Sequence, residues 1–229
     1  MYLYSLLDVS EQTTNAVKWI SVFGVFLVLG VIALIGRFQS EKKFDAKRLA
    51  FAGTCAAMSF TLAIIKISPY SGSITLASFV PILIYAYVYG VADGLMIGLV
   101  HGLLNFIEDA YILTPATFIF DYLLAFMSVG AMGFFGKLHR KEKGVLPVVL
   151  GCVCVFALRF VFHLLSGMIF FAQDAIWVDF PAWAMNNAFA YSFLYQCLYI
   201  PADCLIATLA LVALCKTGVF DKLIQIMKK

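Results

Sequence analysis

Long apolar runs separated by short polar stretches dominate the sequence, and within them apolar and polar residues do not alternate. Seven runs can be drawn, at residues 17–38, 48–67, 74–89, 91–107, 115–138, 147–172 and 183–215. Most are long enough for a membrane-crossing helix, whereas a membrane barrel would show alternating segments of about 10 residues. The pattern therefore predicts a bundle of transmembrane helices, in which Gly90 joins two short members and Pro201 kinks the last.

The composition supports this prediction. The chain is 63% hydrophobic and only 13% charged, with a mean hydropathy of +0.97, whereas a soluble domain holds about 25% charged residues. We therefore predict an all-α polytopic membrane protein with lipid as its surroundings and no nucleic-acid partner. The six cysteines have neither zinc-site nor disulfide-framework spacing, so we expect them to pack as small apolar residues, without a metal or cofactor.

The first run is interpreted as a retained helix and not as a signal peptide. It lacks a basic leading region and follows an acidic, polar start that includes Asp8 and Glu11. We accordingly divide the chain into residues 1–47, an extra transmembrane helix with a basic linker, and residues 48–229, a six-helix membrane domain.

Lysine and arginine residues gather in three stretches, 37–48, 137–143 and 216–229. Seven spans place all three on one side, which the positive-inside rule makes cytoplasmic. The N-terminus is then predicted outside and the C-terminus inside. The turns around 68–74, 108–115 and 173–182 would lie outside, where they either form an aromatic belt with Trp177 and Trp183 or cover a binding site.

Several ionisable residues fall at membrane depth. Asp121, followed by Tyr122, interrupts the apolar stretch TFIFDYLLAF, and such a buried carboxylate usually marks a site or pathway. Arg159 and His163 are four residues apart and so share a helical face. Asp121 and Arg159 could instead form a structural ion pair, and His163 could simply join two helices by a hydrogen bond. Asp203 receives no role.

The last run begins with a stripe of polar aromatic residues. Asn187, Tyr191 and Tyr195 recur every four residues, with Gln196 beside them. They either line a site or only pack between helices. Lys66 lies near the end of its run, where its side chain is expected to reach the lipid headgroups.

No enzyme motif is present: there is no HExxH, GxSxG or P-loop, and no acid cluster suited to a metal. Aromatic rings with one carboxylate, a histidine and amides suit the binding of an organic cation. Ala52 and Ala56 form a small-xxx-small pair, and Gly53 and Ala57 repeat it one residue on, so this helix could approach another closely.

The sequence resembles a known family, the thiamin-specific S components of energy-coupling factor (ECF) vitamin transporters. The resemblance runs from about Ala50 to the C-terminus. Two stretches carry it: GLMIGLVHGLLNFIEDAYILTPATFIFDYLLAFMSVGAMGFFGKL (94–138) and RFVFHLLSGMIFFAQ (159–173). It implies a six-helix subunit of the plasma membrane that captures the vitamin from outside and docks onto a transmembrane coupling subunit driven by two ATPase subunits.

The resemblance also implies residue roles. The family's acid–Tyr pair, histidine and tyrosine match Asp121, Tyr122, His163 and Tyr191, and its Ala-xxx-Ala docking face matches Ala52 and Ala56. The family's acid is typically Glu, and three further positions differ, with Phe171 in place of Trp, Gln196 in place of Asn, and Tyr70, near Gly72, in place of a loop Trp. Arg159, Tyr195 and Asn187 complete the predicted binding residues.

Three functions remain open at this stage. The favoured one is a thiamin-binding S component, and the second keeps the scaffold but binds a thiamin precursor or another heterocycle. The third is a self-sufficient secondary transporter in which Asp121, Arg159 and His163 relay protons, although the sequence shows no inverted repeat. A membrane enzyme is the least favoured interpretation, and the extra helix at 17–38 has no assigned role.

Overall fold

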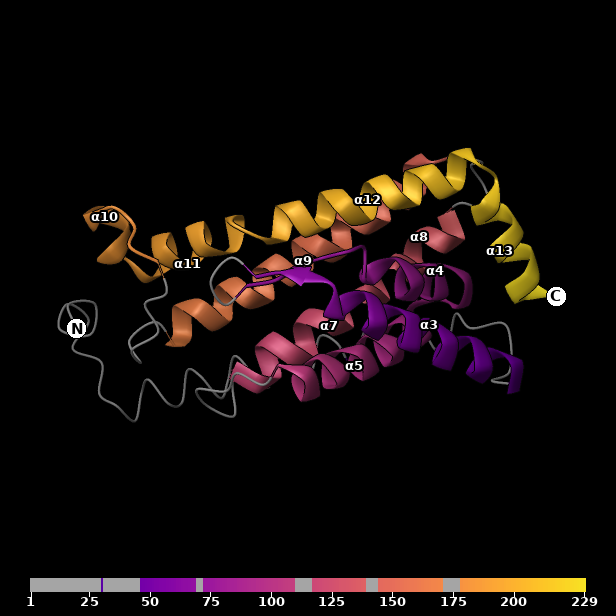
Figure 1. The fold of residues 1–229 in the computed structure, drawn as a ribbon, viewed down its shortest axis with the longest axis horizontal. Coiled ribbons are helices and arrows are strands. Elements are labelled where there is room, and N and C mark those ends of the chain that lie inside the picture. Colours follow the sequence, from indigo (N-terminus) through magenta and orange to yellow (C-terminus); the bar gives the residue numbers. More distant parts are fainter. Residues whose placement is uncertain (1–29, 31–45, 69–71, 110–116, 139–143, 171–177) are drawn as a thin grey trace.

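The computed structural model describes residues 30, 46–68, 72–109, 117–138, 144–170 and 178–229 (Figure 1). Apart from Gly30, the predicted helix at 17–38 lies outside the described residues, as do Tyr70, Phe171 and Trp177. The division of the chain near residue 47 therefore stays a prediction. Within the described parts the chain is helical except for one short β-hairpin, which confirms the all-α fold class.

A short central helix, α4 (Phe79–Tyr89), is surrounded by other helices (Figure 1). Its side chains are buried without a break from Phe79 to Tyr87, and a helix that is apolar on all sides belongs in the interior of a bundle. Its neighbours include α3 (Ala46–Ile64), α5 (Val91–Glu108), α8 (Met132–Leu138) and α12 (Ile200–Lys216). The core of the molecule therefore lies around α4, and the other helices carry the outer surface.

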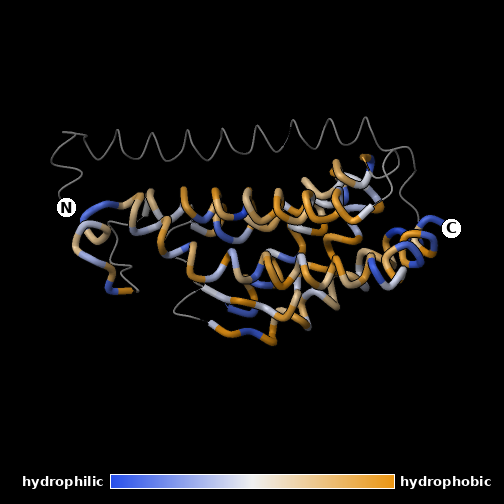
Figure 2. The backbone as a smooth tube through the Cα atoms, turned by 90° about the horizontal axis from the view of Figure 1, so that it is seen from above, coloured by the Kyte–Doolittle hydropathy of each residue, from blue (hydrophilic) through white to orange (hydrophobic). Residues whose placement is uncertain are grey.

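The outer surface suits a bilayer. Four helical stretches are long and apolar enough to cross a membrane, namely Val91–Glu108, Phe118–Leu138, Leu146–Met168 and Ala188–Lys216. Figure 2 shows apolar residues along most of the helices and a largely polar C-terminal end. These features agree with the predicted multi-pass membrane protein.

An antiparallel hairpin replaces the ends of two predicted runs. Its strands, β1 (Lys66–Ile67) and β2 (Ile74–Thr75), pair Lys66 with Thr75 and connect α3 to α4. Ala77, just before α4, has a positive φ of 56°. The apolar run at 74–89 is therefore part strand, part turn and part helix, which hydropathy alone does not distinguish.

The fifth predicted run is one continuous rod with a changing helix type. It begins as a π-helix, η1 (Phe118–Leu124), passes through α7 (Ala125–Met127) and a 3₁₀ turn, η2 (Ser128–Ala131), and ends as α8. The glycines of α5 explain how closely this rod approaches. A Cβ added at Gly98 would collide with the carbonyl group of Phe126, and one at Gly102 with the carbonyl oxygen of Tyr122. Small residues spaced in this way let membrane helices touch backbone to backbone.

The seventh run is divided into three helices. These are α10 (Ala182–Met185), α11 (Ala188–Cys197) and α12. The break falls at Leu198 and Tyr199, and Pro201 lies in the first turn of α12, where a proline costs no hydrogen bond. The predicted kink is therefore present, immediately before the proline. α11 and α12 both pack along α9 (Leu146–Phe170).

The C-terminal helix α13 (Val219–Lys228) folds back over the end of the bundle (Figure 1). Lys47 Nζ donates a hydrogen bond to the Ile226 carbonyl oxygen at 2.9 Å, and Tyr89 Oη donates to that of Met227 at 2.8 Å. The position of Arg48 differs from the sequence prediction. The sequence places Arg48 in the basic stretch 37–48, whereas in the structure it lies in α3, is buried, and pairs through its guanidinium with Asp93.

Candidate ligand-binding site

The carboxylate of Asp121 lies on the π-helix η1 and faces α9. Long π-helical segments are rare and occur mostly at functional sites. Asp121 Oδ1 is 2.8 Å from His163 Nδ1, and Ser166 Oγ donates to Asp121 Oδ2 at 2.7 Å. Because a carboxylate only accepts hydrogen bonds, Nδ1 of His163 carries the proton. The partner of Asp121 is therefore His163, and the alternative of an Asp121–Arg159 ion pair is wrong.

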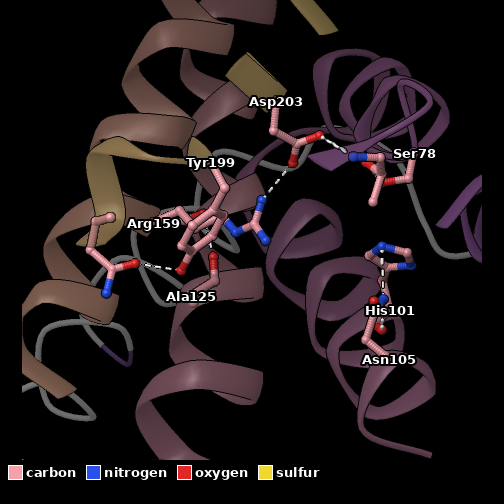
Figure 3. Close-up of polar contacts among 10 residues, drawn as sticks. Ser78, His101, Asn105, Ala125, Arg159, Tyr199 and Asp203 are labelled. Carbon is pink, nitrogen blue, oxygen red and sulfur yellow. Dashed lines mark hydrogen bonds and ion pairs between the residues drawn. The ribbon is translucent and has the colours of Figure 1, made fainter. Parts of the chain in front are cut away.

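Arg159 is bound to Asp203 instead. Its Nη1 is 2.8 Å from Asp203 Oδ2 (Figure 3), and both residues are buried. Its guanidinium carbon lies over the ring of Phe79, 4.6 Å from the ring centroid. Asp203 Oδ1 accepts from the backbone and hydroxyl of Thr75 at 3.1 and 2.8 Å. This network joins α9, α12 and β2, and it gives Asp203 the partner that the sequence could not assign. The three residues of the hypothetical proton relay do not form one hydrogen-bonded chain.

A second histidine lies in the core close to Arg159. His101 is fully buried on α5, and its Nε2 is 3.1 Å from Asn105 Nδ2 (Figure 3). Its ring meets the rings of Phe79 and Phe126 edge-on. The sequence analysis did not single it out. Its four-residue spacing to Asn105 was the available signal.

In the polar stripe predicted for the last run, the two tyrosines lie in a row, whereas the asparagine caps the helix that carries them. Asn187 is the N-cap of α11, and its Oδ1 accepts from the Ala190 backbone at 3.0 Å. Tyr191 and Tyr195 are buried with nearly parallel rings 6.3 Å apart. Val178 N donates to Tyr191 Oη at 3.2 Å.

Tyr199 extends this row and was missed by the sequence analysis. It lies four residues after Tyr195, so the same spacing could have identified it. It is buried, its hydroxyl donates to Gln196 Oε1, and its ring meets that of His163 edge-on at 6.2 Å. Tyr199 therefore connects Gln196 to the Asp121–His163 pair.

Tyr122 lies on a different side of η1 from Asp121. Its hydroxyl donates to the Asp109 carbonyl oxygen at 2.8 Å, and its ring meets Phe106 edge-on at 5.2 Å. The structure therefore places Tyr122 against α5 and does not bring it to His163.

Lys66 forms ion pairs and does not extend alone toward headgroups. Its Nζ is 3.0 Å from Glu108 Oε2 and 2.8 Å from Asp109 Oδ2. Partial burial alone would lower the pKa of Lys66, but its hydrogen bonds to Asp109 and Glu108 outweigh this and raise it. The ammonium charge of Lys66 is therefore kept at neutral pH and is lost as the pH rises through the raised pKa.

The small residues predicted for docking face inward. Ala56 is 8% exposed and belongs to the core, and Ala52 packs against that core. Gly53 and Ala57, the pair offset by one residue, are exposed, and a Cβ at Gly53 would meet nothing within 4 Å. The outward small-residue face of α3 is therefore Gly53 and Ala57.

No group of three or more metal-ligating side chains occurs among the described residues, and the six cysteines are free thiols. Trp183 is 64% exposed, as an aromatic-belt residue would be. The arrangement is thus a cluster of one carboxylate, one imidazole, one amide and three tyrosines, which is suited to binding.

Fold and cluster together define a polytopic helical membrane protein with a small polar site between its helices. The chain belongs to the thiamine transporter protein family (Thia_YuaJ), whose sequence profile matches residues 49–221. This confirms the predicted resemblance to thiamin S components, and the family is one of transporters and not of enzymes.

Two relatives support this assignment. The thiamine transporter ThiT of Bacillus subtilis (strain 168) is 29% identical over 158 residues, which cover 66% of this chain and 78% of that protein. The solved structure of ThiT from Listeria monocytogenes superposes with a TM-score of 0.65 at 25% identity, covering 76% of this chain and 96% of that one.

Proposed function

We propose that this chain is the substrate-capture subunit of a thiamin importer and binds thiamin between η1, α9 and α11. One observation carries the proposal: Asp121 differs from the buried acids Asp93 and Asp203, which are each paired with an arginine. Among the described residues, the hydrogen-bond partners of Asp121 are His163 and Ser166, and neither is an arginine. A neutral histidine leaves the carboxylate charge uncompensated, and thiamin carries the permanent positive charge that would balance it.

The remaining residues supply the ring contacts and hydrogen bonds of this proposed site. Tyr191 and Tyr195 offer aromatic faces, which attract a cation. His163 and Gln196 offer hydrogen bonds to the pyrimidine. Phe171 and Tyr70, which lie outside the described residues, are proposed to complete the site. Asn187 and Arg159 are proposed to support it by holding α11 and α12 in place.

Titration of the purified protein with thiamin, followed by calorimetry, tests the proposed function. We expect saturable binding at one site per chain. The isolated pyrimidine moiety should bind more weakly, because it lacks the charged ring. If thiamin does not bind and the pyrimidine or another heterocycle does, the chain is a capture subunit for a precursor; if none binds, the proposed function is wrong.

Binding of thiamin at this site does not by itself supply the energy for import, so import would require a partner. We propose that the exposed face of α3, centred on Gly53 and Ala57, docks onto a transmembrane coupling subunit that two ATPase subunits drive. This face lies one residue on from the predicted docking residues Ala52 and Ala56, and we propose it in their place because Ala56 is buried and Ala52 is half-buried, whereas exposed small residues allow close approach of another helix. The accompanying orientation, with the N-terminus outside and the C-terminus cytoplasmic, is part of the same proposal.

A further inference from the structure

We propose that the C-terminal helix α13 lies in the membrane–water interface and that one strip of it binds the headgroups of anionic phospholipids. This interfacial strip consists of Val219, Lys222, Ile226 and Lys229. Binding of headgroups there goes beyond the proposed function, because it does not depend on which ligand the protein takes up. It shares with that function only the assignment of the C-terminus to the cytoplasmic side of the membrane.

Contacts with the bundle fix the rotation of α13. Phe220 and Met227, which are two turns apart, are 1% and 5% exposed. Lys47 Nζ donates to the Ile226 carbonyl oxygen and Tyr89 Oη to that of Met227, so the last turn is bound as well. A cation at the carbonyl end of a helix also offsets the negative end of the helix dipole. One side of α13 is therefore held against the bundle, and the other sides are turned away from it.

The turn at Gly218 directs α13 across the end of the bundle (Figure 1). Gly218 has a φ of 73°, in the left-handed region that glycine adopts without steric cost, so the chain can leave the direction of α12. Helices α8 and α12 end here and α3 begins here, which brings Lys137, Lys216 and Lys47 to the same end of the molecule. A basic end of this kind complements the negative surface of an anionic bilayer.

The interfacial strip runs along a side of α13 that the bundle does not cover. Its four residues follow a spacing of three, four and three, so they lie one above another on the helix. Val219 and Ile226 are 39% and 55% exposed although they are apolar, and Lys222 and Lys229 are exposed beside them. Neither lysine forms an ion pair with a carboxylate of the described residues. Exposed apolar side chains next to lysines are typical of a helix that lies in a membrane interface.

The charges of α13 favour a lipid headgroup as the occupant of this strip. Asp221 and Lys228 lie on another side of the helix, so the strip carries positive charge and no negative charge. An anionic phospholipid has what both kinds of side chain require, because its phosphate oxygens accept from the ammonium groups and its acyl chains surround the apolar residues. Free phosphate offers only the first of these contacts.

Amide hydrogen exchange of α13 in the full-length protein without thiamin tests the proposal. The protein is reconstituted in nanodiscs of phosphatidylcholine alone and of an equal mixture of phosphatidylcholine and phosphatidylglycerol. We expect the amides of α13 to exchange on the order of tenfold more slowly in the anionic discs, since each lysine near an anionic surface contributes about fivefold to binding. The difference should largely disappear in about 1 M salt, which shortens the Debye length to roughly 3 Å. Inorganic phosphate added to the phosphatidylcholine discs should not reproduce it.

Two variants with the same change of charge separate the strip from the rest of α13. Lys222→Gln should reduce the slowing about fivefold, whereas Lys228→Gln should reduce it much less, because the helix is about 10 Å across and residue 228 lies about a Debye length further from the headgroups. Ile226→Ser should also reduce the slowing, since it removes an apolar contact with the acyl chains but keeps the carbonyl oxygen that Lys47 binds.

Exchange of α13 that is equal in the two kinds of disc overturns the proposal. Lys228→Gln acting as strongly as Lys222→Gln overturns it too, because the attraction then belongs to the whole charged end. If the discs do not differ and Lys222→Gln stops uptake in cells while thiamin binding is unchanged, the strip is a surface for a protein partner instead. Wild-type protein that does not bind thiamin contradicts the proposed function alone, because no thiamin is present in the exchange experiment.

Discussion

Two ion pairs, Arg159–Asp203 and Arg48–Asp93, are much more deeply buried than the ion pairs of Lys66. Arg159 and Asp203 are 5% and 1% exposed, and Arg48 and Asp93 are 5% and 7% exposed. Removing one member of such a pair leaves a buried charge without a partner, whereas removing both leaves an apolar contact. A partially exposed pair such as Lys66–Asp109 contributes little to stability in either case.

Arg159→Met should therefore destabilise the protein strongly, by about 3–5 kcal/mol. The double variant Arg159→Met/Asp203→Leu should recover much of that loss. Thermal unfolding in detergent measures both, with Lys66→Met as a control that is expected to change the melting temperature little. A double variant no more stable than the single one would contradict the pairing of Arg159 with Asp203.

The charge of Asp121 makes a separate prediction about the ligand. Asp121→Asn keeps an oxygen that can accept from His163 but removes the negative charge. Thiamin binding should weaken on the order of 10- to 100-fold, whereas the uncharged pyrimidine moiety should lose much less, because only thiamin has a cationic ring to attract. Titration with both compounds measures the difference. Equal losses would show that Asp121 does not act through its charge.

The sequence singled out polar residues at membrane depth but did not identify their partners. Asp121, Arg159 and His163 stood out because ionisable groups are rare in apolar runs. Which of them meet depends on helix rotation, and the π-helical turns of η1 change the direction of Asp121 in a way that periodicity does not reveal. Tyr199 was overlooked although it continued a spacing already noticed.

Helix α3 has two faces with different surroundings. Its inner face, with Ser59 and Ala63, is buried in the bundle, while Gly53, Thr54 and Ala57 lie on the outer face. The sequence offers two small-residue registers one residue apart, and the family resemblance favoured Ala52 and Ala56 over Gly53 and Ala57. Only the position of α4 beside α3 decides which register is turned outward.

Two neighbouring alanines of α3 should therefore respond differently to enlargement. Ala57→Leu should abolish uptake in cells while leaving thiamin binding and the melting temperature unchanged, because residue 57 lies on the proposed docking face. Ala56→Leu should instead lower the melting temperature, because it overpacks the core by about 1–3 kcal/mol. Uptake that survives Ala57→Leu and Gly53→Leu would exclude this face as the docking surface.

The glycines of α5 give a test of how η1 is positioned. Gly102→Leu should push the backbone of Tyr122 away, lower the melting temperature and weaken thiamin binding through the displaced η1. Gly53→Ala is the matched control: it adds a methyl group to a membrane helix where there is open space, and helix propensity favours it by about 1 kcal/mol. A Gly102→Leu variant with unchanged stability would disprove the close contact.

Across the whole molecule, polar side chains gather at the two ends of the helix bundle and at the candidate site. The Arg48–Asp93 pair and α13 lie toward the C-terminal end, and Lys66 with Glu108 and Asp109 ties the hairpin to the end of α5. Between them the described helices are largely apolar (Figure 2). The sequence predicted this general layout because hydropathy is a property of long segments, and it failed only where strand, π-helix and helix breaks depend on neighbouring elements.

Transport by the isolated protein provides the test at this scale. Proteoliposomes that contain only this chain should bind thiamin but should not accumulate it under a pH gradient, because Arg159 is held by Asp203 and does not join Asp121 and His163 in a proton relay. Accumulation should require a coupling subunit with active ATPases. Thiamin accumulation that follows the pH gradient without ATP would establish a secondary transporter instead.

The π-helical segment η1 also bears on the shorter acid at position 121. Returning Phe118–Leu124 to α-helical geometry would rotate Asp121 by roughly a fifth of a turn relative to α7, since a π-turn holds more residues than an α-turn. A shorter side chain can therefore be compensated by a rotation of the helix that carries it. An acid shortened by one methylene can meet the same histidine if the helix beneath it is rewound, so replacements at position 121 are best interpreted together with the winding of residues 118–124.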